Sequence, residues 1–328
     1  MISDRIEETM AEVVIGRSRP VFSLIVCTLG RQDRLRRLFA SLAVQNFRDF
    51  EVIVVDQNEG GFLDEIIAAY RPQLDIVHVA AAPGLSGARN VGLAHASGRV
   101  IAFPDDDCWY DATTLSDVMT RMNGERSAAI VAGKTVDRAG RDSVSLFLKA
   151  PASVSRSNYL MCGNSNGLFF HRDVFSEIGH FDTRLGVGAQ SGFQSGEEAD
   201  IILRALSAGL AMRYFPDLRV HHDQVDDAIT DAQVRRARNY GRGFGALLRK
   251  HRFSGLEIAY RVGRPAIGAA LYLLLGRSSL ARYKWTWARA IAEGYRQWPH
   301  AAGRSLADDP GIENAVQHQH RTMPMPYR

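Results

Sequence analysis

Three consecutive aspartates, Asp105 to Asp107, follow the apolar run 99–103. Three carboxylates in a row repel one another unless a cation lies between them. Hard divalent metal ions favour oxygen ligands, so the triplet indicates a metal site at the end of a strand. An acidic loop on a solvated edge explains the same residues equally well, because aspartates are common in loops.

A second acidic group, Glu197, Glu198 and Asp200, opens an apolar-periodic segment that predicts a helix over 198–208. Carboxylates can take up protons in general base catalysis. Acids in the first turn of a helix also stabilise it through the helix dipole, and that is the more common reason for finding them there. The residues alone therefore favour the structural explanation for this group.

The apolar periodicity of the first half predicts the elements that position these acids. Short β-branched runs alternate with helix-period stretches, which is the pattern of a mostly parallel sheet covered by helices. Because ligands of such sheets bind beyond the carboxyl ends of the strands, Thr28, Asp56 and Asp105 should converge on one crevice. The expected strands are 21–28, 50–56, 75–79 and 99–103, and the expected helices are 33–45, 62–70 and 88–96.

The remaining sequence predicts the rest of an α/β domain and a helical segment. From residue 231 onward the pattern is helical, with Gly255, Pro265 and Gly276 expected to interrupt it. Further elements are predicted at 111–123 (helix), 128–136, 167–171 and 218–222 (strands). The expected organisation is an N-terminal extension 1–20, an α/β domain 21–230, a helical segment 231–304 and a flexible tail 305–328.

Six motifs, in their order and spacing, resemble glycosyltransferase family 2, whose members use nucleotide-diphosphate sugars and invert the anomeric centre. The resemblance covers about residues 21–223 and implies a GT-A fold with a Rossmann-like nucleotide-binding half. Each motif alone is weak, whereas the ordered set is specific. The motifs are VFSLIVCTLGR, FEVIVVDQN, PGLSGARNVGLAHASG, VIAFPDDDC, GLFFHRDVFSEIGHFDTRLG and GEEADIILRALSAG.

The resemblance implies a donor site around the aspartates. Asp105 would reach the ribose, Asp107 would coordinate Mg²⁺ or Mn²⁺ together with Asp105, and Asp106 would lie beside them. Such a metal stabilises the charge that develops on a departing nucleoside diphosphate. The other implied contacts are the nucleobase with Asp56, the nucleotide with Thr28, Arg31 and Arg89, and the metal or diphosphate with His222. A histidine at a strand end is equally often structural.

The resemblance also implies that Glu198 is the general base that deprotonates the acceptor hydroxyl, while Glu197 and Asp200 orient it or bind acceptor. This chain has Glu where the family usually has Asp, so both glutamates remain candidates for the base. Asn164 and Asn166 could present amides to acceptor hydroxyls, although a plain turn explains them nearly as well.

Composition bounds the class of protein. The chain has 328 residues, 46% of them hydrophobic, and can bury a large core. Its first twenty residues lack the apolar core of a signal peptide, and its longest apolar run, 266–275, is short for a membrane span. Its three cysteines have no metal-ligand spacing, which favours reduced thiols. These features predict a cytoplasmic protein.

The helical segment is strongly basic. Between Val234 and Arg304 there are fifteen Lys or Arg and two acids, a charge of +13, so the rest of a chain with net charge +4 carries −9. Three of the four tryptophans lie in the same segment. Arg with Trp and Tyr around an apolar helix suits an anionic membrane surface. A helical annex with a solvated basic face explains the composition equally well.

We therefore expect a glycosyltransferase that adds a sugar to a glycan or lipid-linked glycan, as in cell-surface polysaccharide synthesis, at the inner face of the membrane. The chain lacks the Gln-x-x-Arg-Trp signature of processive members, which favours a single transfer. One alternative is a nucleotidyltransferase, which also needs a nucleotide crevice and an acidic metal site. A nucleic-acid-binding protein would use the basic segment but leaves both acidic groups without a purpose, so we expect no nucleic acid partner.

Overall fold

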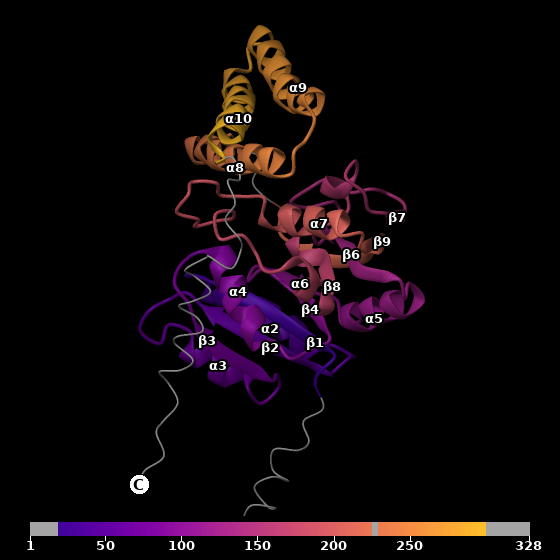
Figure 1. The fold of residues 1–328 in the computed structure, drawn as a ribbon. Coiled ribbons are helices and arrows are strands. Elements are labelled where there is room, and N and C mark those ends of the chain that lie inside the picture. The colour runs from indigo at the N-terminus through magenta and orange to yellow at the C-terminus, as the bar shows by residue number, and fades with distance from the viewer. Residues whose placement is uncertain (1–18, 225–228, 300–328) are drawn as a thin grey trace, which may run out of the picture.

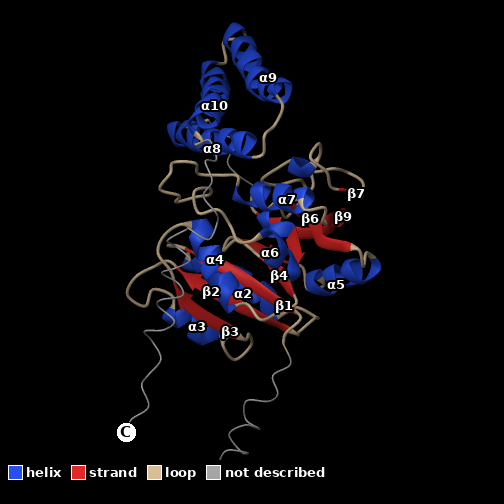
Figure 2. Cartoon of the chain, viewed as in Figure 1, coloured by secondary structure: helices blue, strands red, loops and turns tan. Residues whose placement is uncertain are grey.

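The computed structural model describes residues 19–224 and 229–299. Within them the chain forms a mixed sheet of nine strands, and three long helices stand beyond one end of it (Figure 1). The strands form a central layer with helices packed against it (Figure 2). Two hydrophobic clusters fill the two faces of the sheet. The predicted extension before residue 19 and the predicted tail after residue 304 lie outside the described residues.

The first four strands confirm the predicted parallel half. β1 (Phe22–Thr28) pairs in parallel with β2 (Phe50–Asp56) on one side and with β4 (Val100–Ala102) on the other. β3 (Ile76–Ala80) extends the same sheet beyond β2. The carboxyl ends of these strands therefore meet along one edge, where Thr28 pairs in register with Asp56.

Helices cover this sheet because their apolar residues fall on one side of each helix. The helix after β1 buries Leu35, Leu38, Phe39 and Leu42. One helix on the other face lies so close to the strands that a Cβ at Gly92 would lie 2.3 Å from Cγ2 of Ile25. One face is covered by α2 (Gln32–Ala43), α3 (Asp64–Tyr70) and α5 (Thr114–Gly124), the other by α4 (Leu85–His95), α6 (Asp173–Ile178) and α7 (Glu197–Ser207).

The second half of the sheet is mixed rather than parallel. β8 (Leu168–His171) runs antiparallel to both β4 and β6 (Ala128–Val136). β9 (Ala211–His222) runs parallel to β6 and is much longer than the predicted strand 218–222. The apolar pattern also misses five short elements: β5 (Cys108–Tyr110), β7 (Ala152–Ser153), the helix α6 and the 3₁₀ helices η1 (Tyr159–Met161) and η2 (Ser165–Gly167).

β9 contains a large β-bulge where it pairs with β6. Between the pairs Ala132 with Tyr214 and Lys134 with Arg219, β6 advances two residues while β9 advances five. The extra residues of β9 pass so close to β6 that a Cβ at Gly133 would lie 2.4 Å from the carbonyl oxygen of Leu218. Only glycine fits at position 133 beside this bulge.

The C-terminal unit consists of α8 (Asp231–Lys250), α9 (Gly255–Leu274) and α10 (Ser278–Gln297). Gly255 begins α9 and Gly276 separates α9 from α10 as predicted, but Pro265 lies inside α9 and does not end it. Glycines let α8 and α10 approach closely, since a Cβ at Gly245 would lie 2.1 Å from the carbonyl oxygen of Ile291. None of the helices in the described part of the chain is long and apolar enough to cross a bilayer.

Candidate active site

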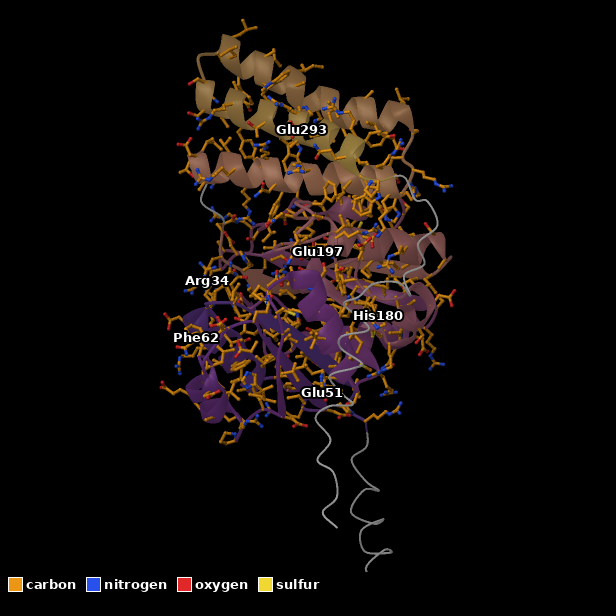
Figure 3. All side chains as sticks on the ribbon, turned by 60° about the vertical axis from the view of Figure 1, so that its left-hand side comes forward. Arg34, Glu51, Phe62, His180, Glu197 and Glu293 are labelled. Atoms are coloured by element: carbon orange, nitrogen blue, oxygen red, sulfur yellow. The ribbon has the colours of Figure 1, made fainter. Side chains whose placement is uncertain are left out.

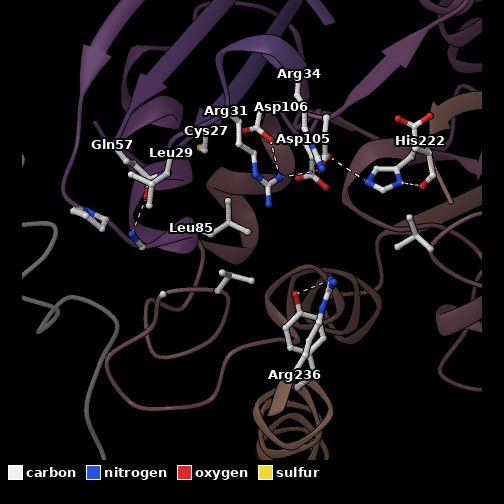
Figure 4. Close-up of a pocket in the computed structure, with 18 of the residues that line it drawn as sticks. Cys27, Leu29, Arg31, Arg34, Gln57, Leu85, Asp105, Asp106, His222 and Arg236 are labelled. Atoms are coloured by element: carbon white, nitrogen blue, oxygen red, sulfur yellow. Dashed lines mark hydrogen bonds and ion pairs between the residues drawn. The ribbon is translucent and has the colours of Figure 1, made fainter. Parts of the chain in front are cut away.

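A cavity of about 660 Å³ opens at the carboxyl ends of β1 and β4 (Figure 4). Asp105, Asp106 and Asp107 line it directly after β4, and His222 lines it from the end of β9. Across the cavity lies Arg236 of α8, with Tyr240 one helical turn further along. The sheet domain and the C-terminal unit thus both contribute walls.

Asp107 is the most heavily paired of the three aspartates. Its Oδ2 accepts hydrogen bonds from Arg31 at 2.9 Å and Arg34 at 2.8 Å, and its Oδ1 lies 3.2 Å from Nε2 of His222. Burial alone would raise the pKa of Asp107, but the hydrogen bond and charge of His222, aided by the arginines, lower it to about 2. The same hydrogen bond raises the pKa of His222. The pair therefore favours a carboxylate next to a protonated imidazole.

Asp106 has the least exposed side chain of the three aspartates. Its side chain is 6% exposed and accepts a hydrogen bond from Arg31 at 3.0 Å. Burial raises the pKa of Asp106 to about 6, although Thr28 and Arg31 act in the opposite direction. Asp106 therefore gains a proton close to neutral pH, which sets it apart from Asp107.

Arg89 connects the aspartates to the second acidic group. Its guanidinium is 2% exposed, with Nη2 3.3 Å from Oδ1 of Asp105 and Nη1 3.4 Å from Oε1 of Glu197. The rings of Phe103 and Phe181 lie against it. Glu197 lies where the sheet domain meets the C-terminal helices (Figure 3). The two acidic groups predicted to share one site are therefore neighbours.

The two glutamates at the start of α7 differ in their surroundings. Glu197 is buried and paired with Arg89. Glu198 is partly buried, and burial together with the negative charge of Glu197 raises its pKa well above the usual range. A raised pKa is the direction of shift that suits a carboxylate acting as a general base.

Asp200 points away from both glutamates. It is fully buried and bonded to Arg204 Nε at 2.9 Å, Lys250 Nζ at 2.8 Å and His251 Nε2 at 2.8 Å. These partners lie on α7 itself and at the end of α8. Through these contacts Asp200 connects α7 to the C-terminal unit. Its role in orienting the base or binding acceptor stays a prediction.

Residues 23–175 match the sequence model of the family described as glycosyl transferase family 2. This part of the chain is therefore similar in sequence to glycosyltransferase family 2. One relative is the "GalNAc(5)-diNAcBac-PP-undecaprenol beta-1,3-glucosyltransferase" of Campylobacter jejuni. It is 28% identical over 157 residues, which cover 46% of this chain and 50% of that protein. A PGL/p-HBAD biosynthesis glycosyltransferase of Mycobacterium tuberculosis is 29% identical over 181 residues, 53% of this chain and 68% of that protein. The chain thus spans half the length of the first relative.

Solved structures of glycosyltransferases share the fold of this chain. Staphylococcus aureus TarS 1–349 in complex with UDP-GlcNAc superposes with a TM-score of 0.53 at 21% identity, covering 85% of this chain and 93% of that one. The mannosyltransferase PcManGT of Pyrobaculum calidifontis, in complex with GDP-Man and Mn²⁺, gives a TM-score of 0.54 at 18% identity, covering 95% and 83%. Both confirm the GT-A-like architecture.

Several family 2 positions named from the sequence do not line the cavity. Asp56 is held by Asn58 and by Nε2 of His78 at 3.0 Å, and its neighbour Gln57 lines the cavity instead. Thr28 and Arg89 are buried behind the wall. The nucleotide contacts of these three residues remain predictions.

The two asparagines predicted to bind acceptor have internal partners. Oδ1 of Asn164 accepts from Thr135 Oγ1 at 2.7 Å, and Oδ1 of Asn166 accepts from the backbone N–H of Asp105 at 2.7 Å. Neither residue lines the cavity. Both hold the framework behind the aspartates, so the turn explanation fits this structure better than the acceptor contact.

Three arginines and one tyrosine that line the cavity were not predicted as site residues from the sequence. Arg34, Arg37, Arg236 and Tyr240 line the cavity but belong to no motif used above. Arg31, Arg34 and Arg37 recur every third residue at the start of α2, a spacing that puts the side chains on one helix face. This spacing is a signal in the sequence that indicates Arg34 and Arg37. Arg236 and Tyr240 come from the C-terminal unit, which no local pattern places next to the aspartates.

The donor atoms suit the metal that family 2 implies. Asp105 and Asp107 offer hard carboxylate oxygens and His222 an imidazole nitrogen, a set that Mg²⁺ or Mn²⁺ accepts. No three His, Cys, Asp or Glu side chains of the described residues are gathered at a spacing that would hold an ion. Instead Arg31 and Arg34 occupy Oδ2 of Asp107, so these cations would have to turn away from it as a metal bound.

Proposed function

We propose that the protein transfers one sugar, with inversion, from a nucleotide-diphosphate sugar to a glycan or lipid-linked glycan. The observation that carries the proposal is the contact of one guanidinium, that of Arg89, with both Asp105 and Glu197. It joins the two acidic groups through one side chain, which supports a donor site and an acceptor site that share one centre. An inverting single displacement requires such a pair, because the base must face the sugar opposite the leaving group.

Glu198 acts as the base in this proposal. Its carboxylate takes the proton of the acceptor hydroxyl while the hydroxyl oxygen bonds to the anomeric carbon and the nucleoside diphosphate leaves with the bonding electron pair. The raised pKa of Glu198 suits this task, since a base is most effective when its pKa lies near the working pH. Glu197 holds Arg89 and thereby fixes the start of α7 relative to Asp105.

Positive side chains around the cavity suit the diphosphate of the donor. Arg31, Arg34 and Arg37 line one side and Arg236 lines the other. Guanidinium groups bind phosphate oxygens in a forked geometry and counter their charge. Asp105, Asp107 and His222 would hold Mg²⁺ or Mn²⁺, and the bound ion would add positive charge that stabilises the leaving diphosphate.

A lipid-linked acceptor is the finer part of the proposal. The name of the Campylobacter relative describes a PP-undecaprenol acceptor, and the C-terminal unit of this chain is basic and rich in Trp and Tyr. We infer that the protein works in the cytoplasm against the inner face of the membrane. Docking there would hold the cavity near its acceptor and lower the entropic cost of their encounter.

The test is a screen of nucleotide sugars with Mg²⁺ or Mn²⁺, read by thermal shift and by slow hydrolysis of the donor. We expect one donor to bind in a metal-dependent way and to bind about tenfold more weakly to Asp107→Asn, because a charged partner of the site is lost. The exposed acid Asp173 provides the control variant Asp173→Asn, which should behave as wild type.

Undiminished metal-dependent binding in Asp107→Asn would remove the metal from that residue. Release of pyrophosphate from a nucleoside triphosphate, with no nucleotide sugar bound, would replace the proposal with a nucleotidyltransferase.

A further inference from the structure

α9 is a long helix with little to pack against. Of its twenty residues only Ala269 is buried. Ile258 and Val262 touch the main hydrophobic core from one side, and α10 flanks the helix along its length (Figure 1). Much of the rest of α9 is exposed, although the helix contains nine large apolar or aromatic side chains and few charged ones.

Five of these side chains form one exposed stripe. Leu256, Tyr260, Ile267, Leu271 and Leu274 are between 55% and 84% exposed. At 100° per residue they fall within an arc of about 60° and extend roughly 27 Å along the helix. A contiguous apolar face of this kind is unusual on a soluble surface and marks a binding surface. We refer to these five residues as the apolar stripe.

The charges around the apolar stripe are positive. Arg264 lies at its edge and Arg277 follows its end, both exposed and neither paired with a carboxylate of the described residues. Glu257 is the only acid of α9, and it is engaged in capping the helix through Ser254. An apolar face with a basic edge and no free acid matches an anionic lipid surface.

The same charges disfavour a second copy of the chain as the occupant. Residue 265 is the midpoint of the apolar stripe, so a two-fold contact of stripe on stripe would bring Arg264 against its own counterpart. Two guanidinium groups brought together in an apolar contact are costly, because each loses water and neither gains a partner.

We propose that the apolar stripe of α9 lies in the plane of an anionic lipid surface, with Arg264 and Arg277 against the headgroups. The inference deepens the proposed function and rests on it for its purpose, which is to present the cavity to a lipid-linked acceptor. The connection is physical, since α10 joins α9 to α8, and α8 supplies Arg236 and Tyr240 to the cavity wall.

Vesicle sedimentation of the full chain tests the proposal without donor or acceptor. We expect the protein to pellet with vesicles of phosphatidylglycerol and phosphatidylcholine and to pellet much less with phosphatidylcholine alone. Leu271→Ser/Leu274→Ser should weaken binding by about tenfold or more, because two large side chains no longer enter the lipid. The control Val44→Ser/Leu146→Ser removes two equally exposed apolar side chains of the sheet domain and should bind as wild type.

Charge is tested by a second pair of variants. Arg264→Gln should reduce the preference for phosphatidylglycerol severalfold, whereas Arg126→Gln, an exposed arginine of the sheet domain, should not. Tyr260→Trp keeps the apolar stripe intact, and its added fluorescence should be quenched by brominated lipid. This variant decides the question even if the serine variant fails to fold.

Three results would overturn the proposal. The first is equal recovery of wild type in the supernatant with both kinds of vesicle. The second is wild-type binding by Leu271→Ser/Leu274→Ser with an unchanged melting curve. The third is a dimer without vesicles that this variant converts to a monomer, which would assign the stripe to a second copy. Vesicle binding is measured without a sugar donor, so it does not depend on catalysis. If the protein binds vesicles while a separate assay with donor and acceptor finds no sugar transfer, the proposed function is refuted and the docking surface stands.

Discussion

Arg89 donates a hydrogen bond from Nη1 to Oε1 of Glu197 over 3.4 Å, and solvent reaches almost nothing of either side chain. The contact joins α4 to the first turn of α7 across 108 residues of sequence. A buried charge without its partner is strongly destabilising. The pair is therefore a sensitive test of how the two acidic groups are held together.

Arg89→Leu should lower the free energy of unfolding by about 3 kcal/mol, because it leaves Glu197 buried and unpaired. Denaturant unfolding measures the change. Arg89→Leu/Glu197→Gln should lose less than the sum of the two single variants, since the second change removes the unpaired charge. Additive losses in this cycle would mean that the two side chains do not interact.

Glu198→Gln should retain donor affinity and lose transfer by about 100-fold or more, because an amide cannot take the acceptor proton. In wild type the value of kcat/KM should rise with pH through the raised pKa of Glu198 and level off above it, since only the deprotonated carboxylate is a base. The variant should lose this limb of the profile. Full activity of Glu198→Gln would assign the base to another residue, with Glu197 the first candidate.

Gly243→Ala should destabilise the protein by about 1–3 kcal/mol, although alanine normally stabilises a helix relative to glycine. The reason is that a Cβ at Gly243 would lie 2.5 Å from the carbonyl oxygen of Ser195, two residues before Glu197. Gly263→Ala on α9 meets nothing within 4 Å and should raise or preserve the melting temperature. Identical melting shifts in the two variants would contradict the close packing of α8 on the active site.

Acid should weaken the junction between the loop that connects α6 to α7 and the C-terminal unit. Asp182 accepts from Lys250 Nζ at 2.7 Å and is 4% exposed. Burial would raise the pKa of Asp182, but the hydrogen bond of Arg184 and the charge of Lys250 lower it to about 2. A depressed pKa contributes stability above the unfolded value, so about 2 kcal/mol should disappear as the pH falls from about 4 to 2.

Unfolding by denaturant at several pH values measures this loss. Asp182→Asn should be less stable at neutral pH and should lose less between pH 4 and pH 2 than wild type. The control Asp173→Asn, at an exposed acid, should keep the wild-type slope. A wild-type slope in Asp182→Asn would place the acid sensitivity elsewhere.

The sequence predicted the parallel half of the sheet well. Strands buried on both faces are near-continuous β-branched runs, and one of them, Phe50–Asp56, has the predicted ends. In the mixed half, Ala128–Val136 also has the predicted ends. Prediction was poorer for β5, β7 and the first half of β9, because two- or three-residue strands show no period and Pro216 interrupts the pattern of β9. Pairing with distant strands, which local residues do not encode, fixes these elements.

The site divides in the same way. Asp105 to Asp107 and Glu197 to Glu198 were found because carboxylates cluster visibly in the sequence. The partners of the acidic groups were harder to find. Arg89 reaches Asp105 and Glu197 only through the tertiary fold, and Lys250 and His251 reach Asp200 in the same way. Asp200 shows the limit of motif reasoning, because its place in the acidic group suggested chemistry while its contacts belong to packing.

The pairing of β6 with β9 around Gly133 restricts changes in the length of β9. β9 delivers His222 to the cavity, and successive side chains of a strand point to opposite faces of its sheet. An insertion or deletion of one residue between Arg219 and His222 would turn the imidazole toward the far side and bring its neighbour inward. Length changes among homologues should therefore be absent from this short stretch.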